Sequence, residues 1–137
     1  AEYLLPAGST VVSYTQKNGK NEVFTTSSAD DKIPLAVLVN ENSASAAEIL
    51  SGDVQDTHAG VIVGTKTYGK GTVQGVYPVG TDAVVKVTIA KYKTAGGREV
   101  DGTGIEPDMV VLLQANSTTD YQLEKAIDVV RTMNLNR

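Results

Sequence analysis

Apolar and polar residues along this chain are arranged in a way that predicts an α/β domain. Residues 35–39, Leu-Ala-Val-Leu-Val, form a continuous apolar run, which is typical of a strand buried on both faces of a parallel sheet. From Ser45 onward, apolar residues recur at helical spacing as far as Val54. A second apolar run covers residues 61–63. This order of strand, helix and strand predicts a parallel crossover.

The lengths of these elements predict where the chain returns. A dozen helical residues carry the chain roughly 18 Å at about 1.5 Å per residue. The following strand brings it back by about 20 Å at roughly 3.3 Å per residue. We therefore expect residues 65–70 to lie beside Ser45, at the carboxyl ends of parallel strands, where open α/β sheets usually hold their sites.

Other segments predict strands added to this unit. Residues 10–16 and 22–26 alternate between apolar and polar side chains, and Asn18-Gly19-Lys20 between them is typical of a hairpin turn. Residues 85–89 also alternate, which predicts a strand with one face in the core and the other in water. The added strands are therefore expected to be antiparallel.

The C-terminal region predicts a second helix. Thr119 and Gln122 have the spacing of a capping pair at a helix start. The apolar stripe that should face the core comprises Leu123, Ala126, Ile127 and Val130.

Two short motifs carry candidate chemistry. Residues 42–49, Asn-Ser-Ala-Ser-Ala-Ala-Glu-Ile, lead into a helix start at Ser45, and Lys70 stands alone between two glycines. A serine acts as a nucleophile only if a base takes its proton. The one histidine, His58, lies outside both motifs in an expected helix-to-strand turn at the surface, which leaves Lys70 as the candidate base. The sequence therefore suggests a serine-lysine hydrolase.

Each motif also has a simpler interpretation. Ser45-x-x-Glu48 fits a capping box, in which the serine hydroxyl accepts from a backbone amide and the glutamate reaches back to the cap. Lys70 could be an ordinary solvated lysine in a glycine turn. Residues 64–70 also fit the first positions of a phosphate-binding P-loop, but Gly71 stands where a magnesium-binding Ser or Thr is required.

A resemblance to a known family favours the catalytic interpretation. Residues 39–50 and 63–74 resemble the catalytic core of the carboxyl-terminal processing peptidases, also called tail-specific proteases. Residues 90–92, 96–98 and 102–108 match the same family. The similarity extends from the first residues to about Val111, and the serine and lysine blocks are highly specific.

The resemblance implies a fold and a set of site residues. Its fold is the crotonase-like (ClpP/crotonase) α/β protease core, with a parallel strand-helix-strand crossover and added antiparallel strands. By motif, Ser45 is the nucleophile, Lys70 the base, and Gln74 helps to hold that lysine, whereas Ser43 is not the nucleophile. The amide of Ala46 would form part of the oxyanion hole. Because four extended residues span about 13 Å, a contact between Gln74 and Lys70 requires a bend.

The resemblance also implies a function. We expect a serine endopeptidase that cleaves proteins near their carboxyl termini, and the rival from another class is a non-catalytic peptide-binding or scaffold domain of the same fold. Two departures qualify this expectation. Ala47 stands where the family often has a further serine. The family's Arg-x-Asn-Pro-Gly-Gly segment, whose glycine amide belongs to the oxyanion hole, and its PDZ domain are both absent from the sequence.

We therefore expect residues 1–137 to be part of the catalytic domain, beginning downstream of both missing parts. Such a fragment should be weakly active or inactive alone.

Composition sets outer limits on partners and compartment. A net charge of -4 over 137 residues, with basic side chains unclustered, argues against nucleic-acid binding. The sequence holds no stretch long enough to span a membrane, no cysteine, and no acidic spacing typical of metal ligands, so we expect no cofactor. The expected partners are protein or peptide substrates, a second copy of the chain is a further candidate partner, and membrane association is left open. The family implies work outside the cytoplasm, in a periplasm or cell envelope.

Overall fold

The computed structural model describes residues 1–16, 18–27, 33–114 and 116–135, and within them the chain forms two sheets and two helices. The first sheet is parallel, in the order β3-β4-β7: β3 (Ala36–Val39), β4 (Val61–Gly64) and β7 (Met109–Val110). The second is antiparallel, in the order β2-β1-β6-β5: β1 (Thr10–Gln16), β2 (Asn21–Thr25), β5 (Thr72–Val79) and β6 (Ala83–Lys93). The expected mixed α/β class is therefore present.

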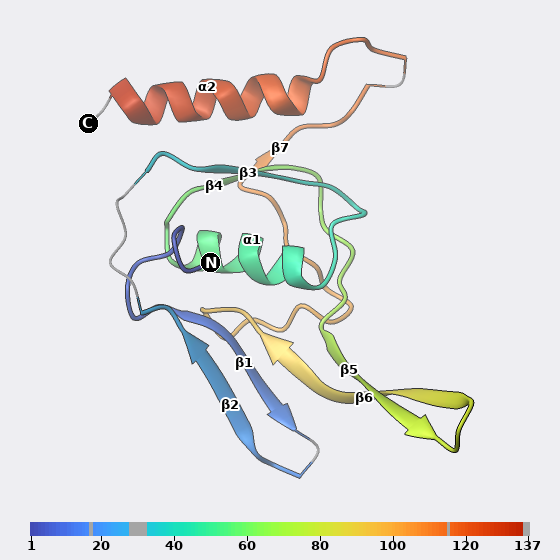
Figure 1. Ribbon diagram of the computed structural model, residues 1–137. Helices are drawn as coiled ribbons and strands as arrows, with labels where there is room; N and C mark the ends of the chain where they lie inside the picture. The colour runs from blue at the N-terminus through green and yellow to red at the C-terminus, as the bar shows by residue number, and fades with distance from the viewer. Residues whose placement is uncertain (17, 28–32, 115, 136–137) are drawn as a thin grey trace.

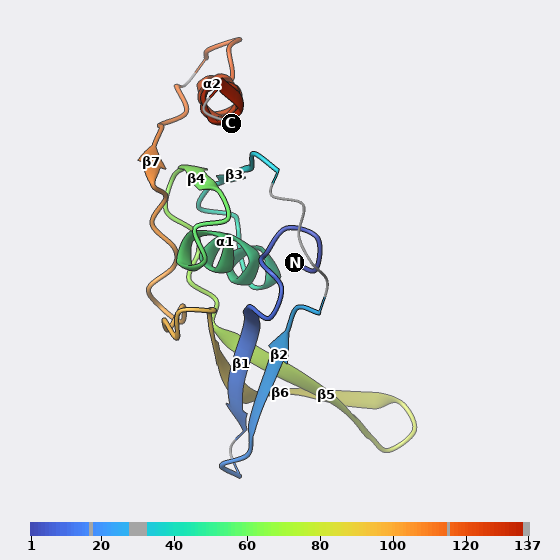
Figure 2. The same ribbon diagram turned by 90° about the vertical axis from the view of Figure 1, so that its left-hand side faces the viewer.

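The elements are stacked in layers. Helix α1 (Ala46–Asp56) lies between the two sheets, and helix α2 (Tyr121–Leu135) covers the opposite face of the parallel sheet (Figure 1; Figure 2). In the part of the chain that the structure describes, neither helix combines the length and apolarity needed to cross a bilayer. Helix α1 is therefore covered by a sheet on each of two sides (Figure 1; Figure 2).

The predicted parallel crossover is present. Strands β3 and β4 pair in parallel, with Ala36 opposite Val61 and Val39 opposite Gly64. Gly64 has a φ of 136°, and a Cβ placed there would lie 1.9 Å from the carbonyl oxygen of Val39, so this position requires glycine. The crossover delivers the chain after β4 to the amino-terminal end of α1, as the lengths predicted.

Three apolar clusters form the core between the elements of these layers. One joins α1 to the parallel sheet, a second joins β4 to α2, and a third lies where β6 meets the segment after it. Their buried members are, in that order, Leu5, Val39, Val54 and Ile62; Val63, Ala126 and Val129; Tyr92, Val100 and Ile105.

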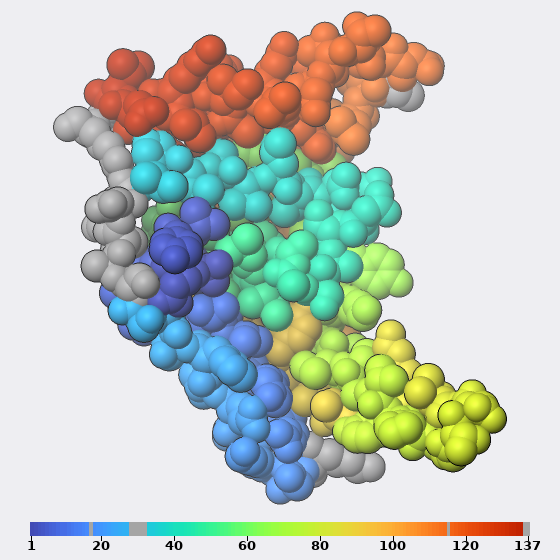
Figure 3. Space-filling view, viewed as in Figure 1, coloured from blue at the N-terminus to red at the C-terminus, as the bar shows by residue number. Residues whose placement is uncertain are grey.

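The outer half of β6 differs from the prediction that one of its faces is buried. Val85 is 44% exposed and Val87 is 42% exposed. The reason is that β5 and β6 extend together beyond the body of the molecule, where no other layer of the described chain covers them (Figure 1; Figure 3). Alternation in one strand identifies two faces but cannot show whether a second layer reaches either of them.

Helix α2 is correctly expected, but its cap and its buried stripe are different. Asp120, not Thr119, caps the helix, because its Oδ1 accepts the backbone N–H of Leu123 at 3.0 Å. Ala126 and Val129 are buried, whereas Leu123 is 46% exposed and Ile127 is 40% exposed. The parallel sheet is narrow, so it covers only one narrow stripe of the helix.

Candidate active site

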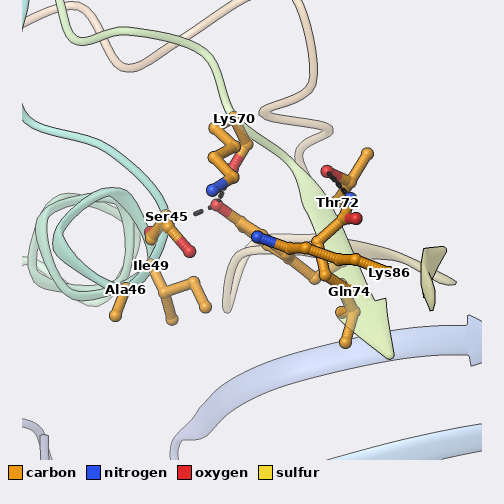
Figure 4. Close-up of a pocket in the computed structure, with 9 residues that line it drawn as sticks. Ser45, Ala46, Ile49, Lys70, Thr72, Gln74 and Lys86 are labelled. Atoms are coloured by element: carbon orange, nitrogen blue, oxygen red, sulfur yellow. Dashed lines mark hydrogen bonds between the residues drawn. The ribbon is translucent and has the colours of Figure 1, made fainter. Parts of the chain in front are cut away.

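A cavity of ≈ 280 Å³ opens where the amino terminus of α1 meets the start of β5 and the side of β6. The four residues predicted for the site all line this cavity: Ser45, Ala46, Lys70 and Gln74. The other lining residues are Ile49, Thr72, Val73, Lys86 and Tyr92. Figure 4 shows Ser45 on the helix side of this space and Lys70 on the strand side. The fold thus brings together residues 25 positions apart in the sequence.

Ser45 has an unusual backbone conformation at the helix start. Its φ is 58° and its ψ is -117°, a region that costs a non-glycine residue about 1–3 kcal/mol. Such strain persists only where the surroundings impose it. The glutamate half of the predicted capping box is formed, since Glu48 accepts the backbone N–H of Ser45 at 2.9 Å, whereas the N–H of Glu48 donates to the carbonyl oxygen of Ser45 at 2.9 Å. These bonds hold Ser45 at the mouth of the helix, outside the regular helical conformation.

The two positions that flank Lys70 require glycine for different structural reasons. Gly69 has a φ of 91°, a conformation that side-chain-bearing residues rarely adopt. A Cβ on Gly71 would lie 2.3 Å from the backbone nitrogen of Asp101. Both positions exclude a side chain, so the glycines allow Lys70 to occupy a tight bend between β4 and β5.

Glu48 joins the helix start to this bend. The carboxylate is fully buried and accepts four hydrogen bonds. Its Oε1 accepts from the Thr67 hydroxyl at 2.6 Å and the Gly69 N–H at 2.6 Å. Its Oε2 accepts from the Lys70 N–H and the Ser45 N–H, both at 2.9 Å. One buried charge therefore fixes the backbones of Ser45 and Lys70 relative to each other.

The same bonds argue against the P-loop alternative. A P-loop uses free backbone N–H groups to hold phosphate and continues into a helix. Here the N–H groups of Gly69 and Lys70 are bound to the carboxylate of Glu48, and the chain continues into strand β5.

Tyr92 supports the site from the β6 side. Its hydroxyl donates to the carbonyl oxygen of Ser45 at 3.1 Å and also contacts the carbonyl oxygen of Lys70. Burial, followed by the negative charges of Glu48 and Asp101, raises the pKa of Tyr92 to about 12. The hydroxyl therefore keeps its proton at neutral pH and remains a donor.

Gln74 lines the cavity but has other hydrogen-bond partners. Its Nε2 donates to Thr88 Oγ1 at 2.7 Å and to Thr72 Oγ1 at 3.3 Å. No hydrogen bond joins Gln74 to Lys70 within the described ranges. The strand register shifts between Val73 and Gln74, which is the kind of irregularity that the expected bend required. A role for Gln74 in holding Lys70 stays a prediction.

Ser43, His58 and Ala46 differ in how they lie relative to the cavity. Ser43 is absent from the cavity lining, and its hydroxyl accepts the N–H of Asn40 at 3.1 Å, which is a turn-forming contact. His58 is exposed, as expected. The N–H of Ala46 has no hydrogen-bond partner among the described residues and lies at the first position of α1. No group of three or more acidic or histidine side chains is placed to hold a metal ion in the part of the chain described.

Three residues of this site have no role that the sequence alone predicts. Glu48 is recognisable from sequence only as a capping residue, although a carboxylate on the buried side of a helix is a signal that it has partners elsewhere. Tyr92 is visible only as part of a family motif. Lys86 reads as the polar member of an alternating strand, and nothing in the sequence indicates that it lines the cavity.

Comparisons with known proteins agree with the resemblance seen in the sequence. A family profile described as peptidase family S41 matches residues 1–111. A carboxyl-terminal-processing protease of Synechocystis is 38% identical over 130 residues, and one of Bartonella bacilliformis is 44% identical over 81 residues. The structure of a photosystem II D1 C-terminal processing protease superposes with a TM-score of 0.73 at 32% identity.

These matches cover most of this chain but a minority of each relative. The Synechocystis match covers 89% of this chain and 30% of that protein, and the Bartonella match covers 59% and 19%. The structural match covers 93% of this chain and 33% of the other. The chain thus spans about a third or less of each of these three relatives.

Proposed function

The chain belongs to peptidase family S41, and on that premise we propose that it carries the Ser45–Lys70 pair of a serine endopeptidase that cleaves proteins near their carboxyl termini. The observation that carries the proposal is that Ser45 and Lys70 line one cavity. Both the strained backbone of Ser45 and the glycine-bounded bend at Lys70 support it, because strain is retained where geometry serves a function.

The proposed reaction begins with a proton transfer. The neutral amine of Lys70 accepts the hydroxyl proton of Ser45 while Oγ attacks the carbonyl carbon of the scissile peptide bond. Negative charge then develops on the carbonyl oxygen. The free N–H of Ala46 and the positive end of α1 stabilise that charge. When the C–N bond breaks, Lys70 returns the proton to the leaving amine, and an acyl-enzyme on Ser45 remains.

The second half of the reaction uses the same groups. A water molecule gives a proton to Lys70 and attacks the acyl carbon, and Ser45 recovers a proton as the carboxylic acid leaves. Glu48 and Tyr92 act as positioning residues, because they hold the backbone of Ser45 against that of Lys70 and touch no reacting atom. Gln74 is proposed as a further positioning residue on the strand side of the cavity.

The wider features of the proposal rest on the family. The fold corresponds to the crotonase-like core, and residues 1–137 form part of the catalytic domain. Substrates are proteins or peptides, and the place of work is outside the cytoplasm. The sequence holds no counterpart of the family's glycine-rich oxyanion segment, so we propose that these residues alone are weakly active or inactive.

A serine-reactive fluorophosphonate probe tests this proposal directly, since labelling requires an activated hydroxyl. We expect the full-length protein to be labelled on the peptide that contains Ser45, and labelling to disappear in Ser45→Ala and in Lys70→Ala. Ser43→Ala is the matched control and should still be labelled. Labelling that survives Ser45→Ala would overturn the assignment, and no labelling of the folded protein would favour the non-catalytic peptide-binding domain.

A further inference from the structure

The cavity beside Ser45 has an uneven distribution of charge. Its nine lining residues include two lysines, Lys70 and Lys86, and no acidic residue. The carboxylates whose charges act on Tyr92 are Glu48 and Asp101. Glu48 is satisfied by four donors. Asp101 is paired with Lys91 at 2.8 Å, and in the part of the chain that the structure describes neither carboxylate forms an ion pair with Lys70 or Lys86.

Lys86 reaches this cavity from β6. Its Cα lies opposite Val76 of β5, and Thr88, two residues further along, bonds to Gln74, so Lys86 shares the face of the hairpin that carries Gln74. Figure 4 shows the Lys86 side chain extended across the cavity toward Ser45. The cationic end of Lys86 is thus placed where a bound peptide would pass.

Among the residues that the structure describes, the two lysines further along β6 have ion-pair partners and Lys86 has none. Lys91 pairs with Asp101 at 2.8 Å, and Lys93 pairs with Glu99 at 3.6 Å. No ion pair or hydrogen bond engages the Lys86 ammonium within the ranges described. An unpaired ammonium in a concave site concentrates anions locally, and here it does so in a chain whose net charge is -4.

We propose that Lys86 is a specificity residue that binds a carboxylate of the peptide substrate next to the scissile bond, an inference that rests on the peptidase function proposed above. The ammonium offers three N–H donors, and a carboxylate is the anion that a peptide supplies. That carboxylate is either the α-carboxylate at the end of the chain or the side chain of an Asp or Glu.

Matched peptides distinguish these two sources. One pair differs only in a carboxyl-terminal carboxylate or amide, and a second pair differs only in Glu or Gln beside the cleaved bond. The specificity ratio is kcat/KM for the charged peptide divided by that for the neutral one, measured in the full-length protein at low salt. The ratio compares two peptides on one enzyme. If a substitution of Lys86 also alters the reactivity of Lys70, that change affects both kcat/KM values equally and cancels in the ratio.

We expect a ratio of about two to five for at least one pair, the size typical of a solvent-exposed ion pair. Lys86→Met should reduce that ratio to about one, and Lys86→Arg should retain it. Lys125→Met, which removes the same charge from the exposed side of α2, is the matched control and should leave the ratio unchanged. A ratio near one for both pairs in the wild type, or a ratio unaltered by Lys86→Met, would overturn the proposal.

Binding measured without cleavage separates this inference from the peptidase function. The same peptides are titrated by calorimetry into Ser45→Ala and into Ser45→Ala combined with Lys86→Met. A carboxylate preference that depends on Lys86 supports the inference whether or not the wild type cleaves. An absence of such a preference contradicts it, even where the wild type hydrolyses every peptide.

Discussion

Glu48 is the residue on which the geometry of the site depends most. A buried charge is costly unless several donors satisfy it, and here each carboxylate oxygen accepts two hydrogen bonds. The donors come from the helix start and from the bend before β5. The energetic cost of burying the charge is thus offset by bonds that hold Ser45 and Lys70 in one arrangement.

We expect Glu48→Gln to weaken both the fold and the site. A glutamine amide would direct its NH₂ group at two of the four donors, and each buried donor left unsatisfied costs about 1–3 kcal/mol. The free energy of unfolding, measured with urea, should therefore fall by about 2–6 kcal/mol. Fluorophosphonate labelling of Ser45, measured below the unfolding transition, should fall as well.

Glu124→Gln is the control for that experiment. It makes the same chemical change on the exposed side of α2, and its effect on the free energy of unfolding should stay within about 0.5 kcal/mol. If Glu48→Gln labelled as fast as the wild type, the positioning role of this carboxylate would be refuted.

At the residue level, the sequence singles out candidates that belong to a short motif, and their catalytic roles stay predictions. Ser45 and Lys70 each belong to such a motif, and the structure places both beside one cavity. The roles of Glu48 and Tyr92 depend on partners 19 to 47 residues away in sequence, so no local pattern could reveal them. The hydrogen bond of Gln74 to Thr88 could not be predicted, because it depends on how β5 pairs with β6 and on the register shift just before Gln74.

At the scale of elements, two aspartates fasten α1 to the turn that follows β6. Asp53 accepts the N–H of Ala95 at 2.8 Å, and Asp56 pairs with Arg98 at 2.7 Å. Asp53 is fully buried, and its Oδ2 has no hydrogen-bond partner among the residues described. Burial, opposed by the Ala95 bond and reinforced by the charge of Asp56, raises the pKa of Asp53 to about 7.

This raised pKa makes stability depend on pH in a defined direction. The folded protein binds the Asp53 proton more tightly than the unfolded chain, whose pKa is near 3.8. Stability from this group is therefore fully present below pH 3.8 and is lost as the pH rises through about 7. Asp53→Asn should remove this loss and stabilise the protein at pH 8, by up to ~4 kcal/mol.

Urea unfolding of the wild type and Asp53→Asn at intervals from pH 4 to pH 9 measures this difference. The gap between the two free energies should widen as the pH rises and level off above about pH 7. Asp128→Asn, an exposed carboxylate on α2, should show no such trend. A constant gap across the range would show that Asp53 titrates normally.

Helices and strands could be predicted where the nearby sequence alone determines their type and pairing. The crossover of β3, α1 and β4 followed from two apolar runs and a helical repeat, because strand and helix lengths constrain the return of the chain. The exposed half of β6 and the rotated stripe of α2 were not predictable. In both cases burial depends on how far a neighbouring layer extends. The apolar and polar pattern of a single element carries no information about that extent.

At the scale of the whole molecule, the layers explain why the cavity is open on one side. The parallel sheet and α1 support Ser45, while the β5–β6 hairpin that carries Gln74 and Lys86 projects away from the body (Figure 3). Several apolar side chains of this hairpin are exposed, among them Val76 and Val84 at 60% and 67%. Water therefore reaches the cavity, which weakens electrostatic stabilisation of a developing charge.

We accordingly expect residues 1–137 alone to hydrolyse an unstructured peptide far more slowly than the full-length protein. One missing oxyanion donor typically reduces turnover by about 10²–10³. The measurement compares kcat for the two proteins on the same substrate, with circular dichroism verifying that the shorter one is folded. Equal turnover would mean that these residues already contain a complete oxyanion hole.

Ser45 and Lys70 are proposed to act together as nucleophile and base, and kcat/KM of single variants in the full-length protein is the measurement that depends on both roles. We expect Ser45→Ala and Lys70→Ala each to lose activity by at least about 10³, since groups that act as one unit fail together. Ser43→Ala, which alters a turn-forming hydroxyl, should lose far less. The account would be contradicted if Ser45→Ala or Lys70→Ala cleaved the peptide at a rate close to that of the wild type.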